Sequence, residues 1–306
     1  MARRRNRGRS VNGVLLLDKP TGITSNAALQ MVKRLFNANK AGHTGSLDPL
    51  ASGMLPVCLG EATKISGFLL SADKEYRAIC KLGVTTDSGD ADGEVREIRV
   101  PGEFAIARVR EVLESFLGQS QQIPPMHSAI KREGQPLYKL AHQGIEVERE
   151  PRDITIHSLK LLRLEGDELE LDVRCSKGTY IRVLAEDIGE ALGCGAHIAA
   201  LRRMSVGALD GHSLHTLDSL QAIVEQSGTS ALDEMLLPME STLPDWPEVS
   251  LSEDASFYLC QGQAVFVPQL TDRGWVRLYA NDKRFLGLGT VLDDGRVAPK
   301  RLLSNN

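Results

Sequence analysis

Residues suited to chemistry concentrate in the segment from Gly42 to Gly53, which reads Gly-His-Thr-Gly-Ser-Leu-Asp-Pro-Leu-Ala-Ser-Gly. Polar side chains on a glycine-punctuated loop are commonly aimed into a cleft by the rigid elements on either side. Asp48 has no second carboxylate at a fixed spacing, so it could act as a nucleophile or as a general base. The structural alternative is that Asp48-Pro49 initiates a turn and His43 caps a strand end.

A second segment, residues 176–189, supplies a counter-charge for such a carboxylate. It reads Ser-Lys-Gly-Thr-Tyr-Ile-Arg-Val-Leu-Ala-Glu-Asp-Ile-Gly, with Tyr180 and Arg182 at the start of a predicted helix. An arginine held against Asp48 would keep the carboxylate ionised, lower its pKa and orient its oxygens. The alternative is an ordinary surface arginine in the first turn of a helix.

Markers of the common cofactor chemistries are absent. The sequence contains no GxxxxGK[ST], HExxH or GxSxG motif, and Gly287-Leu288-Gly289 lacks the third glycine of a dinucleotide site. The run from Asp87 to Gly93 would place Ser88 and Arg99 at two principal positions of a calcium loop, so a polar hairpin is favoured. The cysteines lack CxxC spacing and are odd in number, which argues against disulfides and zinc: Cys58, Cys80, Cys175, Cys194 and Cys260. We expect catalysis without cofactor or metal.

Charge is unevenly distributed along the chain. The 306 residues include 36 Lys and Arg against 40 Asp and Glu, a net charge of −4. Residues 204–272 contain eleven acidic residues and no lysine or arginine, so the remainder has 36 basic against 29 acidic residues, or +7. Such asymmetry fits a protein with one face toward a polyanion, although an unevenly charged solvated surface is the alternative.

The elements that must position these residues follow from periodicity. Alternation and apolar runs predict strands at residues 13–17, 54–59, 76–82, 154–164, 169–175, 275–279 and 285–292. Helical spacing predicts a helix to Leu35 with Ser25 as N-cap and Met31 on its apolar stripe, and further helices at 105–117, 137–141 and after Tyr180. Residues 119–152 are interpreted as a mobile arm or lid. The irregular order predicts an α+β fold with a small C-terminal β domain.

The termini and hydropathy point to a cytoplasmic protein that does not enter a membrane. The longest aliphatic run, Val14 to Leu17, is far shorter than the roughly 20 residues of a membrane helix. The basic start, Met-Ala-Arg-Arg-Arg-Asn-Arg-Gly-Arg-Ser, is followed by no apolar region, so it does not resemble a secretory signal.

Five segments in order give the chain a specific resemblance. They are Val-Leu-Leu-Leu-Asp-Lys-Pro-Thr-Gly-Ile-Thr-Ser, the Gly42–Gly53 loop with Met-Leu-Pro-Val after it, Asp-Lys-Glu-Tyr, Gln-Ile-Pro-Pro-Met-His-Ser-Ala-Ile-Lys, and Gly-Thr-Tyr-Ile-Arg-Val-Leu-Ala-Glu-Asp-Ile-Gly. Together they resemble the bacterial tRNA pseudouridine-55 synthases of the TruB type, over nearly the whole chain. The ending Gly-Arg-Val-Ala-Pro-Lys-Arg is similar to the PUA-like RNA-binding domain of that family.

The resemblance implies a fold and a division of the chain. We expect a pseudouridine-synthase fold, with a central mixed or antiparallel sheet flanked by helices and a small β-rich PUA-like domain. The implied parts are a basic disordered tail at 1–10, a catalytic domain at 11–248 and the PUA-like domain at 249–306. Within the catalytic domain, residues 119–152 correspond to the family's thumb, which closes over RNA.

The resemblance also implies a cofactor-free reaction, the isomerisation of uridine to pseudouridine at position 55 in the T-arm loop of tRNA. Asp48 matches the catalytic aspartate, Arg182 its partner, and Tyr76 the aromatic that stacks on the base and assists proton removal from carbon 5. An aromatic face suits an unstacked base. Whether Asp48 attacks carbon 6 of uracil, attacks carbon 1′ of the sugar, or acts as a base is left open.

Four further residues match positions around the flipped base. His43 is expected to act as a wedge, and Tyr180 and Leu201 to line the uracil pocket. Lys19, with Pro20, is expected to shape the floor of the pocket as a substrate-binding residue, and a core or turn role is the alternative.

The thumb of the family supplies the expected RNA contacts. Its basic residues would meet phosphates, so affinity should fall steeply with salt: Lys131, Arg132, Lys139, Arg149 and Arg152. His127 departs from the tyrosine or phenylalanine expected there, which leaves thumb packing open.

The expected partner is therefore the T stem-loop of tRNA, with no membrane, no obligate protein partner and a monomeric chain. Two alternatives remain. One is an RNA-remodelling protein that keeps the fold, against which intact Asp48, Tyr76 and Arg182 argue. The other is a synthase of archaeal or eukaryotic ribonucleoproteins, against which the lack of a long basic extension argues.

Overall fold

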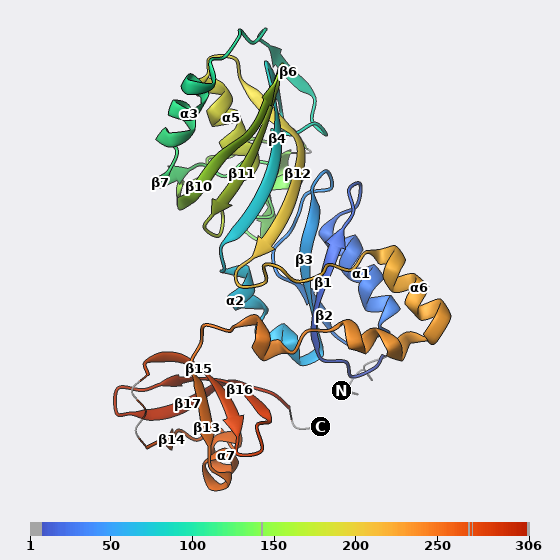
Figure 1. Ribbon diagram of the computed structural model, residues 1–306, viewed down its shortest axis with the longest axis vertical. Coiled ribbons are helices and arrows are strands. Elements are labelled where there is room, and N and C mark those ends of the chain that lie inside the picture. The colour runs from blue at the N-terminus through green and yellow to red at the C-terminus, as the bar shows by residue number, and fades with distance from the viewer. Residues whose placement is uncertain (1–7, 142, 269, 271, 305–306) are drawn as a thin grey trace.

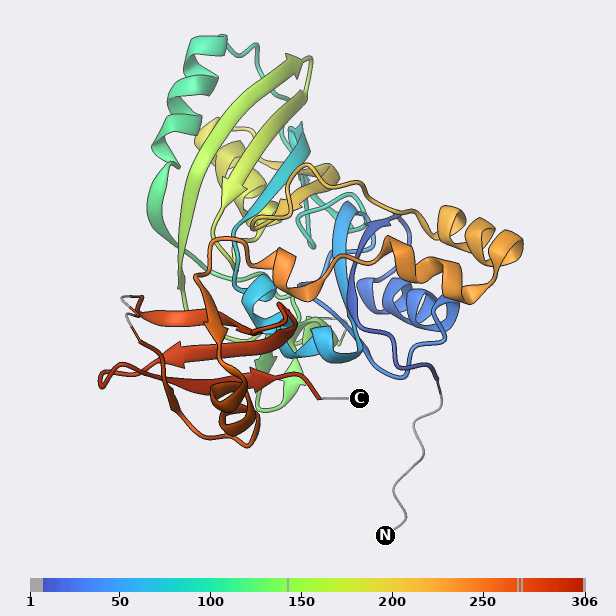
Figure 2. The same ribbon diagram turned by 60° about the horizontal axis from the view of Figure 1, so that its bottom comes forward.

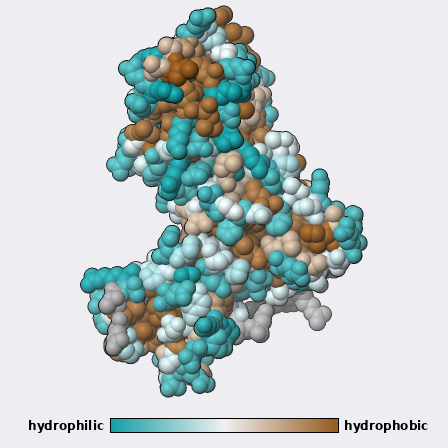
Figure 3. All heavy atoms as spheres, in the orientation of Figure 1, coloured by the Kyte–Doolittle hydropathy of each residue, from teal (hydrophilic) through white to brown (hydrophobic). Residues whose placement is uncertain are grey.

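The computed structural model describes residues 8–141, 143–268, 270 and 272–304. A larger part is built on one long sheet, and a smaller C-terminal part on a second sheet lies at the lower left of the view (Figure 1). A notch on the left flank of the molecular surface separates the two parts (Figure 3). The predicted α+β fold with a C-terminal β-rich part is confirmed.

The large sheet contains strands from most of the chain: β1 (Gly13–Lys19), β2 (Ala41–His43), β3 (Ser52–Leu59), β4 (Lys74–Leu82), β7 (Gly118–Gln122), β10 (Arg152–Glu165), β11 (Glu168–Cys175) and β12 (Ala196–Val206). Its order is β1-β3-β12-β4-β11-β10-β7, with β2 also paired to β3. All neighbours are antiparallel except β12 and β3, which pair in parallel through Arg202 with Ser52 and Arg203 with Gly53. The sheet is therefore mixed, as predicted.

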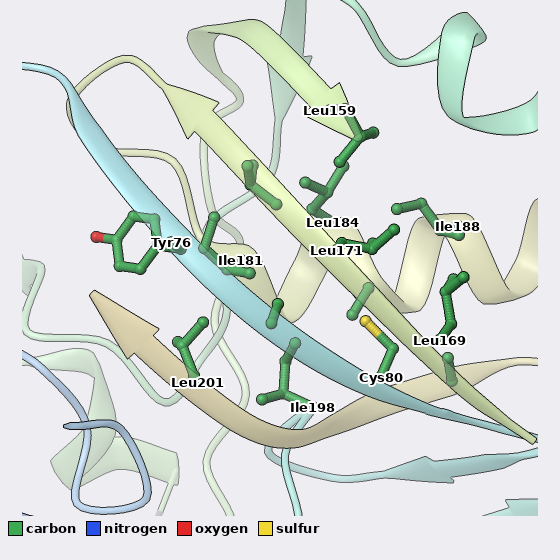
Figure 4. Close-up of a cluster of buried hydrophobic side chains, with 14 of the residues drawn as sticks. Tyr76, Cys80, Leu159, Leu169, Leu171, Ile181, Leu184, Ile188, Ile198 and Leu201 are labelled. Carbon is green, nitrogen blue, oxygen red and sulfur yellow. The ribbon is translucent and has the colours of Figure 1, made fainter. Parts of the chain in front are cut away.

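Helices pack against the sheet at several places along its strand order: α1 (Ser25–Leu35), α2 (Ser66–Leu70), α3 (Ile106–Ser115), α5 (Ile181–Ala191) and α6 (Leu217–Ser227). Helix α1 contacts β2 and β3, α6 contacts β1, α5 contacts β12 and β4, and α3 contacts β10. Figure 2 shows α3 running alongside the long strand β10. Strand β4 alternates buried positions with less buried ones, and its inward side chains pack with those of α5 in one hydrophobic cluster (Figure 4). Residues of α3 belong to the same cluster. Such a period of two suits a strand with one covered face.

The meeting point of β3 and β12 requires glycine. Gly53 has φ +97°, and a Cβ there would lie 2.3 Å from the Arg203 carbonyl oxygen. Only a residue without a side chain allows this approach at this backbone conformation. The two halves of the sheet are thus joined beside Arg203.

Smaller elements complete the larger part: β5 (Val84–Thr86), β6 (Val95–Ile98), β8 (Lys131–Arg132), β9 (Gln135–Pro136), α4 (Leu137–Ala141) and the 3-10 turns Gly60–Lys64, Thr229–Met235 and Met239–Thr242. The segment Asp87–Gly93 is the polar loop of the β5–β6 hairpin, as favoured from the sequence.

Two local expectations are wrong. Thr24, not Ser25, is the N-cap of α1, because Thr24 has the extended backbone of a cap and its hydroxyl accepts from the Ala27 amide at 3.1 Å. Met31 is 37% exposed instead of lying on the buried stripe, whose members include Leu29 and Val32.

The thumb, residues 119–152, begins inside the sheet. Its first four residues belong to β7, which pairs with β10 from Arg152 to Ile156, so the chain leaves the sheet only after Gln122. Residues 1–7 of the predicted basic tail lie outside the described residues. Arg9 of that tail pairs with Ala38 in an isolated bridge and with Asp233 in an ion pair.

The C-terminal part contains β13 (Glu248–Leu251), α7 (Glu253–Cys260), β14 (Val265–Phe266), β15 (Gly274–Ala280), β16 (Phe285–Val291) and β17 (Arg296–Leu302). Its sheet has the order β13-β15-β16-β17-β14. Among the described residues, no helix is long and apolar enough to cross a membrane.

An aromatic joint fixes the two parts to each other. Phe68 packs edge-on against Trp246 and Trp275, with ring centroids 4.7 and 4.8 Å away. The Lys64 ammonium also donates to the Leu302 carbonyl at 2.7 Å. Residues of both parts share one hydrophobic cluster here, so their relative orientation is held by packing.

Candidate active site

A cavity of about 490 Å³ brings six of the predicted site residues together, and for that reason it is called here the main cavity. Its wall is formed by the Gly42–Gly53 loop, by β4 and β12, by the start of α5 and by the root of the thumb. The predicted residues that line it are His43, Asp48, Tyr76, Tyr180, Arg182 and Leu201. This volume lies within the usual range of roughly 300–1,000 Å³ for ligand pockets. A larger hollow of about 730 Å³ shares Asp48 and Arg182 with the main cavity.

Asp48 and Arg182 form an ion pair at the edge of this cavity. The Arg182 Nε atom lies 3.0 Å from Asp48 Oδ2, and the arginine side chain is 6% exposed against 43% for the aspartate. Arg182 is therefore a buried residue that holds a reachable carboxylate, and the alternative of a surface arginine is wrong.

Backbone oxygens fix the other end of the guanidinium. Arg182 Nη1 donates to the Ser88 carbonyl at 2.6 Å and Nη2 donates to the His127 carbonyl at 2.7 Å. A second carboxylate, Asp90, has its Oδ2 atom 3.6 Å from Arg182 Nε. The planar fork is thus oriented on three sides, which orients Asp48 in turn.

The pKa of Asp48 is shifted opposite to the expectation. Burial raises this pKa above its ordinary value, and the nearby charge of Arg182 lowers it without cancelling the effect of burial. The prediction of a net lowering by Arg182 is wrong because it left out desolvation of the carboxylate. A carboxylate whose pKa is shifted by its surroundings, lying at a cleft, is typical of a functional group.

Hydrogen bonds from Ser25 hold the loop that carries Asp48 in place. The Ser25 hydroxyl accepts from the Leu47 amide at 2.7 Å and donates to the Leu47 carbonyl at 2.9 Å, and this serine is buried. Both backbone groups of the residue before Asp48 are therefore bonded to one side chain.

Lys19 also supports the loop but does not line the main cavity. Its side chain is fully buried, and its ammonium donates to the carbonyls of Pro20 at 2.8 Å, Ile23 at 2.8 Å and Pro49 at 3.4 Å. Burial lowers the pKa of Lys19 to about 8. These contacts fit the core or turn alternative, in which Lys19 holds the backbone around Pro49 in place, and its expected role at the floor of the pocket stays a prediction.

Tyr76 and Leu201 form the apolar wall of the cavity. Figure 4 shows them at one end of the hydrophobic cluster, with the Tyr76 oxygen pointing away from the core. Tyr76 is 9% exposed, and burial raises the pKa of its hydroxyl, so the ring is held as a neutral phenol.

Arg203 is a cavity residue that sequence reasoning missed. It is 1% exposed, lies opposite Tyr76 in the β4–β12 register and interacts with the Tyr76 side chain. Its Nε donates to the Met54 carbonyl at 2.7 Å and its Nη2 to the Gly45 carbonyl at 3.2 Å. The signal was available: Arg203 is two residues from Leu201, on the same face of a strand.

His43 lines the cavity as a neutral ring. Burial lowers its pKa, and the charge of Arg203 lowers it further. A neutral imidazole fits the expected packing role better than a role as a proton carrier.

Gln122 is a second residue that sequence reasoning missed. Its side-chain oxygen accepts from the Tyr180 amide at 2.8 Å, and its side-chain nitrogen donates to the Tyr180 carbonyl at 3.1 Å. The sequence places Gln122 in a stretch with several glutamines, and only the pairing of β7 with β10 shows which of them is buried.

The predicted RNA-contact residues lie in the thumb, outside the main cavity. A separate hollow of about 420 Å³ is lined by Lys131, Arg132, Arg149 and Arg152, whereas Lys139 lies exposed on α4. Arg132 Nη1 donates to the Glu148 carbonyl at 2.6 Å, and Arg149 pairs with Glu146 at 3.1 Å. His127, where the sequence departs from the expected aromatic, lines the main cavity. Among the described residues, no group of three or more His, Cys, Asp or Glu side chains could hold a metal ion.

Three family models match successive parts of the chain. The model for "TruB family pseudouridylate synthase (N terminal domain)" matches residues 33–181. The model for "tRNA pseudouridylate synthase B C-terminal domain" matches residues 182–244. The model for "Pseudouridine synthase II TruB, C-terminal" matches residues 247–303.

Relatives match over nearly the full length. The chain is 56% identical over 300 residues to tRNA pseudouridine synthase B of Nitrosococcus oceani, covering 98% of this chain and 97% of the relative. It is 54% identical over 295 residues to the protein of that name in Ectopseudomonas mendocina, covering 96% of each. Among solved structures, a Cbf5-Nop10-Gar1 complex matches with a TM-score of 0.72 and 28% identity, covering 96% of this chain and 84% of that chain.

Proposed function

This chain belongs to the TruB family of pseudouridylate synthases and isomerises uridine to pseudouridine in tRNA, and we propose that its target is uridine 55 in the T-arm loop. The observation that supports the chemistry is the Asp48–Arg182 pair at 3.0 Å, set beside Tyr76 in one cavity, and the relatives named tRNA pseudouridine synthase B support the choice of RNA. A nucleobase inside a stem-loop must leave its stack before it can enter such a cavity. The neutral Tyr76 ring provides a face on which it can stack.

The reaction conserves the atoms of the nucleotide. The bond from N1 of uracil to C1′ of the sugar breaks, the base turns, and a bond from C5 to C1′ forms. C5 loses its proton and N1 gains one, so no oxidant or phosphate donor enters the balance. The residues of this chain must therefore bind the free base, stabilise charge and move one proton.

Each site residue has a distinct role in this proposal. Asp48 is the reacting carboxylate, as nucleophile at carbon 6 or carbon 1′ or as a base. Arg182 keeps the Asp48 oxygens oriented, and the raised pKa of Asp48 reflects a carboxylate that binds a proton or an electrophile more readily than it would in water. Tyr76 stacks on the uracil and assists removal of the C5 proton.

The cavity and thumb supply binding. Tyr180, Leu201 and His43 enclose the base, with His43 filling the place that the flipped nucleotide vacates. The basic thumb residues contact phosphates of the stem: Lys131, Arg132, Lys139, Arg149 and Arg152. We propose that the C-terminal part is a PUA-like RNA-binding domain and that the enzyme works in the cytoplasm as a monomer without an obligate protein partner.

Conversion of uridine in an unmodified T-arm stem-loop RNA tests the proposal. The wild-type protein should convert one uridine per RNA, and replacing that uridine by cytidine should abolish product. The Asp48→Asn variant should bind the RNA but convert it at least about 10²-fold more slowly. Tight binding without conversion by the wild type would instead favour an RNA-remodelling protein.

The stability of Asp48→Asn serves as the control. Because burial raises the folded-state pKa of Asp48, its ionisation disfavours the folded protein as pH rises above the ordinary value of 3.8. The variant should therefore unfold at the same or a higher temperature than wild type at pH 7. A large loss of thermal stability would attribute the lost activity to misfolding.

A further inference from the structure

Gln122 makes two hydrogen bonds to the backbone of Tyr180, and we name this pair of bonds the Gln122 clasp. The side chain is 5% exposed, and it bonds both the amide and the carbonyl of Tyr180, at 2.8 and 3.1 Å. A glutamine amide offers one acceptor and two donors, so it can satisfy both backbone groups of a single residue. The clasp therefore links the end of β7 to the start of α5 through two hydrogen bonds.

The two ends of the clasp have different tasks. Gln122 is the last residue of β7, after which the chain leaves the sheet to form the thumb. Tyr180 is the N-cap of α5, and Arg182 follows in the first turn. The Tyr180 side chain makes no capping hydrogen bond, so the bonds from Gln122 to the Tyr180 backbone fix the entry to the helix that carries Arg182.

A second contact joins the same two regions. Arg182 Nη2 donates to the His127 carbonyl at 2.7 Å, and His127 lies five residues into the thumb from Gln122. The root of the thumb thus holds both the backbone that precedes Arg182 and the guanidinium itself. A displacement of the thumb root would therefore shift Arg182 relative to Asp48, whose Oδ2 atom lies 3.0 Å from Arg182 Nε.

Gln122 itself is not among the residues that line the main cavity. Its two side-chain hydrogen bonds run to the backbone of Tyr180, so its effect on the reaction passes through Tyr180 and Arg182. We propose that Gln122 is a positioning residue, through which the seating of the thumb on RNA sets the orientation of Arg182 and hence of Asp48. This inference rests on the proposed function of the same site.

Substitutions of Gln122 separate positioning from binding. Gln122→Glu keeps the size of the side chain but replaces its N–H donor by an oxygen that faces the Tyr180 carbonyl. Gln122→Met keeps the length and removes both hydrogen bonds. Gln119, exposed on the same strand, provides matched controls as Gln119→Glu and Gln119→Met.

Three quantities are measured with T-arm stem-loop RNA: the Kd, the single-turnover rate constant and the unfolding temperature. Both Gln122 variants should bind RNA within about 3-fold of wild type and convert it roughly 10- to 100-fold more slowly, since a misplacement of about 1 Å can cost about 10²-fold. The Gln119 variants should match wild type in the Kd and in the single-turnover rate constant.

A double-mutant cycle tests the link to the thumb. Lys131→Gln should weaken binding in either background, but it should slow the single-turnover rate at saturating RNA only where Gln122 is intact. Equal slowing in both backgrounds would overturn the coupling.

Other outcomes also decide the inference. Unchanged single-turnover rates in folded Gln122 variants, or a Kd that rises in proportion to the lost rate, would overturn it. Loss of cooperative unfolding in both variants would assign Gln122 a purely structural role. Absence of conversion by wild type would contradict the proposed function instead, and the two failures are therefore distinguishable.

Discussion

Arg182 is surrounded by more carboxylates than one cation neutralises. Asp48 and Asp90 lie 3.0 and 3.6 Å from its Nε, and Glu186 follows one turn later on α5. Burial and the charge of Asp187 raise the pKa of Glu186 to about 7, and Arg182 opposes this shift. A carboxyl group with a raised pKa therefore lies one helical turn from Arg182, outside the lining of the main cavity.

Replacing Glu186 should make stability less dependent on pH. A carboxyl group whose folded-state pKa is about 7, against an ordinary 4.5, favours the folded state when protonated. Its contribution is present at low pH and is lost as pH rises from about 4.5 through 7. Glu186→Gln should thus raise the unfolding temperature relative to wild type by about 2 °C at pH 8 and by less at pH 5.

Thermal unfolding of both proteins between pH 5 and pH 8 measures this difference. Glu103→Gln, a change of the same type at an exposed position, is the control and should show no trend with pH. A constant offset between Glu186→Gln and wild type would show that the folded-state pKa of Glu186 is ordinary.

The sequence identified residues whose chemistry is visible in isolation and missed those whose role depends on pairing. Asp48 and Arg182 stand out by type and context, and the structure places them 3.0 Å apart. Arg203 and Gln122 act through carbonyl and amide groups of segments remote in sequence. The direction of the pKa shift of Asp48 was missed for a related reason, because desolvation depends on what the fold packs around the carboxylate.

At the scale of elements, the start of α1 separates two neighbouring hydroxyl groups by function. Thr24 caps the helix, whereas Ser25 bonds both backbone groups of Leu47 in the loop that carries Asp48. Ser25→Ala should therefore slow conversion by about 10-fold through loop disorder. Thr24→Ala should lower the free energy of unfolding by about 1 kcal/mol and leave the rate nearly unchanged.

Single-turnover rates and urea unfolding of the two variants check this separation. Equal effects of both substitutions on the rate would mean that the helix start acts as one unit and that the Ser25 bonds have no special part in placing the loop.

Strands and helices with strong periodicity were predictable, and boundaries set by distant partners were not. The alternation at 76–82 corresponds to β4, and the predicted helix at 137–141 corresponds to α4. The first thumb residues have mostly exposed polar side chains, and only their bonds to β10 make them a strand. The N-cap prediction for α1 failed although serine ranks above threonine as a cap, because the Ser25 hydroxyl is engaged by the backbone of Leu47, a residue remote in sequence.

At the scale of the whole molecule, the acidic run and the basic thumb belong to different regions. The thumb hollow carries Lys131, Arg132, Arg149 and Arg152, whereas residues 204–272 run through α6 and α7. We expect the affinity for T-arm RNA to fall steeply with salt. Each phosphate-contacting lysine or arginine removed from the thumb should reduce the slope of log K against log salt by about 1.

Titrations of Lys131→Gln at several salt concentrations measure that slope, with Lys33→Gln on α1 as the control. A slope for Lys131→Gln identical to that of wild type would contradict a phosphate contact at this lysine.

The aromatic joint gives the molecule a built-in optical reporter. The chain has two tryptophans, and both Trp246 and Trp275 lie in that joint, with ring centroids 5.5 Å apart and Phe68 against each. Indole emission therefore reports on the aromatic joint between the catalytic and C-terminal parts, while the tyrosines of the catalytic cavity do not contribute at indole-selective excitation. A red shift on RNA binding would mean that the joint becomes exposed to water, and a constant spectrum would mean that the two parts keep their packing when RNA binds.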